Sequence, residues 1–201
     1  VTNVDREHLD YYGNFEKLKK SFQEFIDKTP SFGKSIACID NNNLKSLLNK
    51  CEKKNFLTYG FSKSSNYQII NVKKNINYSI FDLKIKFVGN KIHTIKNIRV
   101  NLLGNHNISN TAASVAVALN LGIKLDKIKK ALKKFLGIQR RFTKIFSLGR
   151  IEFFDDYAHH PTEIKAVTNS AREVYRERKI ICVFQPHRYS RVKMLKNEFA
   201  S

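Results

Sequence analysis

The chain of 201 residues has no tryptophan, only three prolines and only three cysteines. Cys38, Cys51 and Cys182 are odd in number and widely spaced, and no CxxC pair occurs. This pattern argues against a disulfide framework or a zinc site. We therefore expect reduced, buried thiols.

Long hydrophobic runs are also missing. No apolar stretch approaches the roughly 18 residues that span a bilayer, and residues 1–5 lack the charged and apolar regions of a signal peptide. We expect a cytoplasmic protein without a membrane partner. The 42% of hydrophobic residues, 15 Phe among them, suffices to build a buried core.

Acidic residues are scarce, with 17 Asp and Glu against 37 Lys and Arg, so the net charge is +20. Such a balance is typical of proteins that bind nucleic acid. However, 27 of the 37 basic residues are Lys, and they are spread through most of the chain. The densest cluster, within residues 127–134, alternates with apolar residues as on the solvated face of a helix. We expect no nucleic-acid partner, although a basic nucleic-acid-binding module remains an alternative.

The first part of the chain alternates predicted strands and helices. Asn14 caps a helix with apolar residues at helical spacing, and a strand at 35–40, a helix at 43–51 and a strand at 56–61 follow. This rhythm indicates an α/β fold with a mostly parallel sheet. Residues 67–103 alternate in polarity, with a turn signal at Gly89-Asn90, and predict an antiparallel meander.

The second part begins after an Ala-rich helix at 109–121 and a Lys-rich helix. We place a domain boundary near Gly137, which divides the chain into domains 1–137 and 138–201. The elements predicted for the second domain are too few for a complete domain, so we expect this domain to be truncated. These elements are a hairpin at 143–154, a helix from Pro161 to about residue 176, a strand at 180–184 and a helix from Arg191.

Two polar loops carry the strongest functional signal. Residues 155–164 read DDYAHHPTEI and residues 184–191 read FQPHRYSR, and each loop lies between a predicted strand and a predicted helix. Ligands of open α/β sheets bind at the carboxyl ends of strands, where such loops lie. Acids, imidazoles and guanidiniums at this edge favour an anionic substrate.

Three weaker groups fit a nucleotide and a carboxylated sugar. His8 stands among carboxylates and suits Mg²⁺ when phosphates supply further ligands, or it is simply a solvated loop residue. Residues 104–110 (GNHNISN) offer amides at a helix start for a base or a phosphate, or they only cap that helix. For Arg140 and Arg141 two interpretations stay open: contact with a phosphate, or ordinary surface charge.

Taken together and in order, these motifs resemble the Mur ligase family over essentially all 201 residues. The resemblance is carried by Thr2-Asn3-Val4, His8-Leu9-Asp10, Gly104 with His106-Asn107 and Asn110, Arg140-Arg141-Phe142, and the two polar loops. It implies an ATPase-like central domain followed by a truncated Rossmann-like C-terminal domain. The two loops are similar to those of the member that joins L-alanine to UDP-N-acetylmuramate in peptidoglycan precursor synthesis.

The resemblance also implies an ATP-dependent amide ligase that works through an acyl phosphate, and a role for each matched residue. His8 would bind Mg²⁺, Asn107 and Asn110 the adenine, Arg141 the ATP phosphates, and Asp156 would orient the nucleotide. Tyr157, His159, Arg188 and Arg191 would face UDP-N-acetylmuramate and L-alanine, with Arg141, His159 and Arg188 in catalytic roles.

The chain also departs from the family pattern. Asp5 and Glu7 stand where the family commonly has Glu and Asp, and no G-x-x-x-x-G-K-[ST] phosphate loop occurs. The family's UDP-binding N-terminal domain has no counterpart here either. We therefore expect that residues 1–201 alone do not ligate. A ligase that recycles murein tripeptide and a decayed, inactive remnant remain alternatives.

Overall fold

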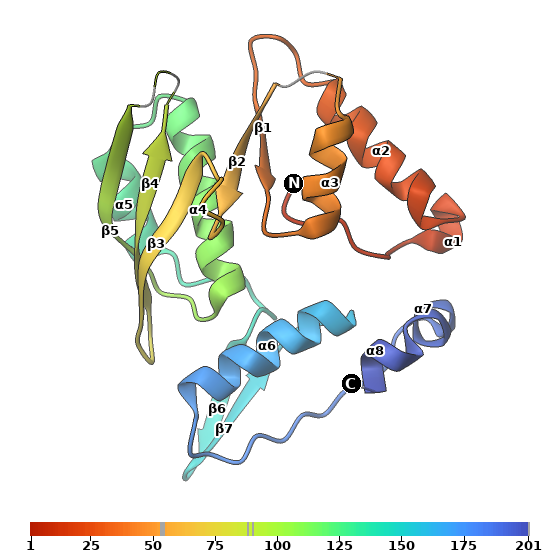
Figure 1. The fold of residues 1–201 in the computed structure, drawn as a ribbon. Coiled ribbons are helices and arrows are strands. Elements are labelled where there is room, and N and C mark those ends of the chain that lie inside the picture. The colour runs from red at the N-terminus through yellow and green to blue at the C-terminus, as the bar shows by residue number, and fades with distance from the viewer. Residues whose placement is uncertain (53–54, 88, 90, 201) are drawn as a thin grey trace.

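The computed structural model describes residues 1–52, 55–87, 89 and 91–200. Its larger sheet has the order β1-β2-β3-β4-β5 (Figure 1). The strands are β1 (Ser35–Cys38), β2 (Phe56–Gly60), β3 (Tyr67–Lys74), β4 (Ser79–Lys86) and β5 (Ile92–Val100). β1, β2 and β3 run parallel, whereas β3, β4 and β5 form the antiparallel meander. The mixed sheet confirms the α/β class.

The turn predicted between β4 and β5 is only partly visible. Gly89 has a φ of +80°, a conformation that glycine adopts without steric cost. Asn90, the other residue of that predicted turn, lies outside the described residues.

The first helices are α1 (Leu9–Tyr12), α2 (Phe15–Asp27) and α3 (Asn42–Lys50). The side chain of Asn14 accepts a hydrogen bond from Lys17 N at 2.9 Å, so the predicted cap of α2 is confirmed. Leu18 and Ile26 are the buried residues of α2, and α2 packs with α3 beside β1.

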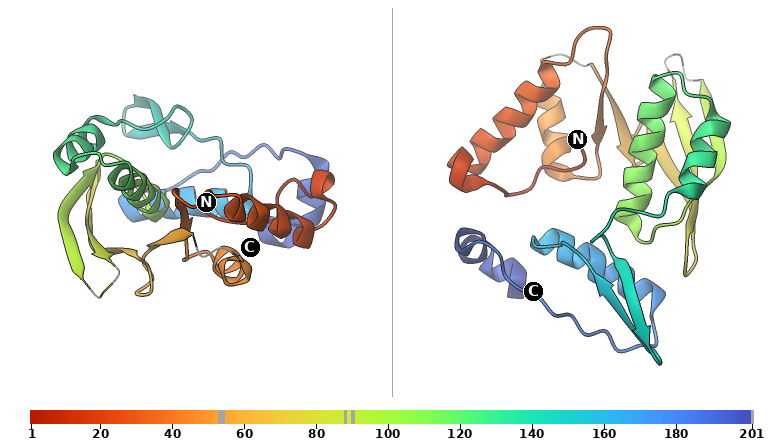
Figure 2. Two further views of the ribbon diagram at one scale, coloured as in Figure 1. Left: turned by 90° about the horizontal axis from the view of Figure 1, so that it is seen from above. Right: turned by 180° about the vertical axis from the view of Figure 1, so that it is seen from behind.

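Helices α4 (Asn105–Asn120) and α5 (Leu125–Lys134) cover one face of the sheet (Figure 2). Small and branched side chains of α4 are fully buried against the strands, among them Ile108, Ala112 and Val115. Burying a side chain of the size of Ile or Val contributes about 1.5–3 kcal/mol. On α5, Ile128 is buried and the basic residues at 127, 130, 133 and 134 are exposed, which confirms the predicted solvated face for these four. Lys129 is half-buried, and its Nζ donates to the carbonyl oxygen of Lys96 at 2.6 Å.

α4 begins at Asn105, four residues before the predicted start. Gly104 precedes it with a φ of +88°, and a left-handed residue at that place lets the chain turn directly into the helix. Asn107 and Asn110 therefore lie in the first two turns of α4.

The C-terminal elements lie below the sheet in Figure 1. They are β6 (Thr143–Leu148), β7 (Ile151–Asp155), α6 (Pro161–Val174), α7 (Tyr189–Met194) and α8 (Lys196–Ala200). β6 and β7 form the predicted antiparallel hairpin, and the rings of Phe146 and Phe153 stack at 4.2 Å between centroids.

One predicted element is wrong. Residues 180–184 are neither strand nor helix, although their sequence is apolar. A strand requires a hydrogen-bonding neighbour, and within the described residues β6 and β7 pair only with each other. Cys182, predicted to be buried, is exposed for the same reason, whereas Cys38 and Cys51 are buried as expected.

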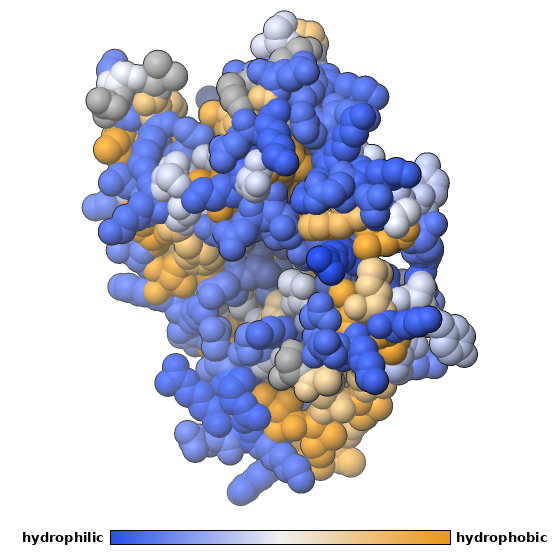
Figure 3. All heavy atoms as spheres, turned by 45° about the vertical axis from the view of Figure 1, so that its right-hand side comes forward, coloured by the Kyte–Doolittle hydropathy of each residue, from blue (hydrophilic) through white to orange (hydrophobic). Residues whose placement is uncertain are grey.

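An apolar surface accompanies this arrangement. Hydrophobic side chains gather on the lower, C-terminal half of the molecule in Figure 3. The exposed large hydrophobic residues of this half include Ile145, Phe146, Leu148, Ile151, Ile181 and Val183. Patches of this kind are typical of surfaces that pack against another element.

β3 and the start of α4 both approach α6. Lys74 of β3 donates to Glu173 of α6 at 2.7 Å. At the start of α4, a Cβ on Gly104 would lie 2.1 Å from Ser170 Oγ of α6, so only glycine permits this close approach.

Among the described residues, the helices are too short or too polar to cross a membrane.

Candidate functional site

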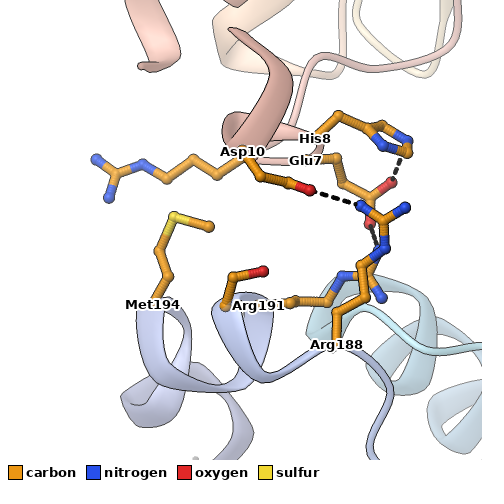
Figure 4. Close-up of a pocket in the computed structure, with 8 residues that line it drawn as sticks. Glu7, His8, Asp10, Arg188, Arg191 and Met194 are labelled. Carbon is orange, nitrogen blue, oxygen red and sulfur yellow. Dashed lines mark hydrogen bonds and ion pairs between the residues drawn. The ribbon is translucent and has the colours of Figure 1, made fainter. Parts of the chain in front are cut away.

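The loop that leads into α1 faces α7 across the two halves of the molecule (Figure 4). Arg188 Nη1 donates to Asp10 Oδ2 at 3.0 Å, and Arg191 Nη2 lies 3.0 Å from Glu7 Oε1. His8 Nε2 lies 3.8 Å from the other oxygen of Glu7. The first motif of the sequence and the last are thus in direct contact.

Two of these side chains belong to residues with a positive φ angle. His8 precedes α1 with a φ of 54°, and Arg188 precedes α7 with a φ of 67°. A non-glycine residue in this region costs about 1–3 kcal/mol and persists only when its surroundings hold it. Both residues therefore occupy positions that the ion pairs around them help to define.

Arg191 is the most buried cation of the site, with 7% of its side chain exposed. It also donates to the carbonyl oxygen of His187 at 3.2 Å. The cavity between the loop and α7 measures about 10 Å³, which is room for about one water molecule. In this conformation the guanidiniums of Arg188 and Arg191 are paired with the carboxylates of Asp10 and Glu7. An anionic ligand that binds these guanidiniums has to replace the two carboxylates.

His159 lies between the two halves as well. Its Nδ1 is 2.9 Å from the carbonyl oxygen of Tyr157. A carbonyl can only accept a hydrogen bond, so Nδ1 carries the proton. Nε2 lies 3.9 Å from Glu7 Oε1, and the rings of Tyr157 and His187 stand edge-on to the imidazole. Nε2 is therefore the nitrogen that faces the gap between the halves.

The start of α6 fixes this imidazole. Pro161 occupies the first turn, and His160 Nδ1 accepts from Thr162 N at 3.3 Å. Glu163 accepts from the backbone of His159 and His160 and completes a capping box.

Asp156 joins two backbone segments. Its Oδ2 accepts from Phe142 N at 2.7 Å, and its Oδ1 accepts from Ala158 N at 2.6 Å. Arg140 and Phe142 have positive φ values of 58° and 51°, so the turn that carries Arg141 needs such anchors. The carboxylate of Asp156 thus sets the position of Arg141.

A cavity of about 1110 Å³ opens between the lower end of the sheet and the β6–β7 hairpin. This volume accommodates a nucleotide-sized ligand. Of the described residues, Asn107 and Arg141 line it, whereas Asn110 and Asp156 do not. Asn107 Nδ2 donates to the carbonyl oxygen of Leu103 at 2.8 Å, which leaves its Oδ1 for a ligand.

His106 lies beside this region. Burial lowers the pKa of its imidazole below 6.5, the nearby Asp156 carboxylate opposes that shift, and the Arg141 guanidinium reinforces it. At neutral pH the imidazole is uncharged, so it adds no positive charge next to Arg141.

The residues around His8 fit a divalent cation only in part. The described residues contain no group of three His, Cys, Asp or Glu side chains that could hold a metal. His8 keeps 55% of its side chain exposed and offers one nitrogen. Mg²⁺ prefers oxygen ligands and is commonly held by one or two carboxylates together with phosphate oxygens and water, so the His8 nitrogen fits only as one ligand beside such oxygens.

The structure brings His8, Tyr157, His159, Arg188 and Arg191 to one place and sets Arg141 beside it through Glu163. Asn107 and Asn110 lie apart, on α4. The sequence pattern indicates no separate role for Glu163, and it marks Glu7 and Asp10 only as neighbours of His8. The one signal for Glu163 was its place three residues after the helix cap, but His160 is not a usual capping residue.

Comparison with known proteins agrees with these motifs. Residues 1–118 match the Mur ligase middle domain, and residues 140–201 match the Mur ligase, glutamate ligase domain. The UDP-N-acetylmuramate–L-alanine ligase of Pelagibacter ubique is 52% identical over 200 residues. That alignment covers 100% of this chain and 43% of the relative, so the chain spans less than half the length of this relative.

Solved structures give the same fold. UDP-N-acetylmuramate-alanine ligase MurC from Thermotoga maritima superposes with a TM-score of 0.71 at 26% identity, over 96% of this chain and 42% of that one. MurF ligase from Thermotoga maritima in complex with ADP gives a TM-score of 0.64 at 19% identity, over 84% and 37% of the two chains. From its matched domains and its fold, the chain belongs to the Mur ligase family.

Proposed function

We propose that this chain forms the central and C-terminal parts of an ATP-dependent ligase that joins L-alanine to UDP-N-acetylmuramate in peptidoglycan precursor synthesis. The observation that carries the proposal is the convergence of His159, Arg188 and Arg191 on Glu7 and Asp10, just before and within the first turn of α1. The UDP-N-acetylmuramate–L-alanine ligase of Pelagibacter ubique, 52% identical over 200 residues, supports the same activity.

The proposed reaction has two steps. A carboxylate oxygen of UDP-N-acetylmuramate attacks the γ-phosphorus of ATP, and ADP leaves, which produces an acyl phosphate. The amine of L-alanine then attacks the acyl carbon, loses a proton, and the tetrahedral intermediate expels inorganic phosphate as the amide forms. Each step develops negative charge that fixed cations stabilise, and water must be kept from the acyl phosphate.

Arg188 and Arg191 suit the anionic groups of this reaction. Each guanidinium already contacts a carboxylate, that of Asp10 or Glu7, at 3.0 Å. These two contacts support the proposal that the pair binds carboxylates. In our proposal the carboxylate of L-alanine or of the muramate replaces Glu7 or Asp10. His159 lies nearby, with Nε2 3.9 Å from Glu7 Oε1, and the Tyr157 ring contacts its imidazole.

The nucleotide is proposed to lie in the larger cavity. Asn107 and Arg141 line it, so Arg141 would contact the ATP phosphates and Asn107 the adenine. Asn110 lies outside the lining of this cavity, and its proposed contact with the adenine rests on the family resemblance alone. Asp156 would act on the nucleotide partly through the Arg141 turn that it anchors. His8 would hold Mg²⁺, which supplies charge neutralisation for the phosphates when bound.

The division into domains 1–137 and 138–201 stays a proposal. Gly137 lies between α5 and β6 with a φ of +97°, and the two matched family domains end and begin on either side of it, at residues 118 and 140. Limited proteolysis that cuts first near residue 137 would support this boundary.

The proposed activity is tested by ADP release from the native polypeptide that contains residues 1–201. We expect release that requires both UDP-N-acetylmuramate and L-alanine. Turnover of murein tripeptide in place of L-alanine would favour the recycling ligase instead. Tight binding of duplex DNA at physiological salt, without ADP release, would favour the nucleic-acid-binding module.

A further inference from the structure

Glu163 lies at the start of α6, between two residues of the proposed site. Its side chain is 34% exposed. Oε2 accepts from His159 N at 3.1 Å and from His160 N at 3.4 Å, and it lies 3.7 Å from His159 Nδ1. Oε1 accepts from Arg141 Nη1 at 3.4 Å. One carboxylate thus contacts both Arg141 and the His159 segment.

Helix capping explains the contacts of Oε2 with the backbone but not the contact of Oε1 with Arg141. A capping box needs one acceptor oxygen directed at the backbone before the helix, and Oε2 fulfils that role. Oε1 points instead to a guanidinium that lies 22 positions earlier in the chain. The negative charge, which capping does not require, is placed between two groups that carry or can carry positive charge.

The electrostatics agree with this geometry. Burial by itself would raise the pKa of the Glu163 carboxyl, but the backbone of His159, its imidazole and Arg141 together lower that pKa below 4.5. At neutral pH Glu163 is therefore ionised. A fixed negative charge here holds the Arg141 side chain, which is 52% exposed and would otherwise lose rotamer entropy on binding a phosphate.

We propose that Glu163 is a positioning residue for the ligation reaction, orienting Arg141 toward the nucleotide cavity and His159 toward the gap between the halves. This inference rests on the proposed function. It assigns to Glu163 no contact with the substrates, because its two oxygens are occupied by Arg141 and the His159–His160 backbone.

The test compares Glu163→Gln with Glu16→Gln in the native polypeptide. Gln keeps an oxygen for the capping box but removes the charge. Glu16 is a matched control, because it also lies in the first turn of a helix and pairs with a lysine, Lys19, away from the site. We expect Glu163→Gln to retain the melting temperature while the KM for ATP rises and kcat/KM falls about tenfold or more, as for other residues that orient a functional side chain. Glu16→Gln should change neither.

A double-mutant cycle separates positioning from general damage. In an Arg141→Ala background, Glu163→Gln should cost much less than in the wild type, because the group it orients is gone. An equal cost in both backgrounds, or wild-type kinetics for Glu163→Gln, would overturn the inference. If the wild-type polypeptide releases no ADP with L-alanine, the proposed function fails instead, so the two failures are distinct.

Discussion

Asp10 and Arg188 are 178 positions apart, yet Arg188 Nη1 donates to Asp10 Oδ2 at 3.0 Å. Their side chains are 54% and 42% exposed, so the pair contributes little to stability in water. Its significance is geometric. It places the guanidinium of α7 at the edge of the opening where we propose that anionic substrates bind.

We predict that Arg188→Lys in the native polypeptide lowers kcat/KM for L-alanine or UDP-N-acetylmuramate several-fold or more, because Lys cannot form the two parallel hydrogen bonds of a guanidinium. The melting temperature should hardly change. Arg150→Lys, at an exposed position in the turn of the β6–β7 hairpin, is the control and should leave the kinetics unchanged. Unaltered kinetics for Arg188→Lys would remove Arg188 from the site.

Gly104 tests the packing that holds the two halves together. Gly104→Ala should destabilise the protein by about 2 kcal/mol or more, since the residue has a positive φ and its Cβ would meet Ser170 Oγ at 2.1 Å. Gly122→Ala is the matched control: its φ is +75°, and no atom lies within 4 Å of the added Cβ. Urea unfolding should show the larger loss for Gly104→Ala. Equal losses would mean that backbone strain alone decides.

We predict that the free energy of unfolding depends on pH through His106. Its pKa is lowered in the folded state, chiefly by burial, with Asp156 opposing and Arg141 reinforcing the shift, while the unfolded chain keeps a value near 6.5. The unfolded chain therefore binds the proton more readily, and this group weakens the fold as the pH drops below 6.5. Above 6.5 its effect on stability vanishes.

His106→Gln should flatten this part of the profile. The free energy of unfolding, measured by urea at pH 7.5 and at pH 5.5, should differ less in the variant than in the wild type. The same difference in both proteins would show that other groups cause the dependence.

Residues 1–201 expressed alone should show no L-alanine-dependent ADP release. The chain contains no G-x-x-x-x-G-K-[ST] sequence, the loop whose backbone and lysine hold ATP phosphates in proteins that carry it. An ADP assay at high protein concentration checks this expectation. Release that rises with L-alanine would mean that other residues here hold the phosphates.

Local patterns were enough to predict most elements. The cap at Asn14 depends only on nearby residues, as does the spacing of apolar residues in α2, α4 and α5. The structure has the cap and the three helices as predicted, apart from the early start of α4. The strand predicted at 180–184 failed because pairing depends on a neighbour and not on apolar composition.

The site was predictable in its members but not in its contacts. His8, His159, Arg188 and Arg191 stood out as polar residues in loops, because loops at strand ends commonly carry function. The pairing of Arg191 with Glu7 depends on how the two halves pack, which no local pattern encodes. Glu163 was missed because its capping partner is a histidine.

The proposed ligation predicts the fate of each carboxylate oxygen, which can be followed with UDP-N-acetylmuramate labelled with ¹⁸O in both carboxylate oxygens, together with ATP, L-alanine and the native polypeptide. Mass spectrometry should find an amide product that has gained L-alanine and retains one ¹⁸O, and inorganic phosphate that carries the other, because the acyl phosphate transfers a carboxylate oxygen to phosphorus. Unlabelled phosphate, or ADP without the amide product, would contradict the proposed ligation.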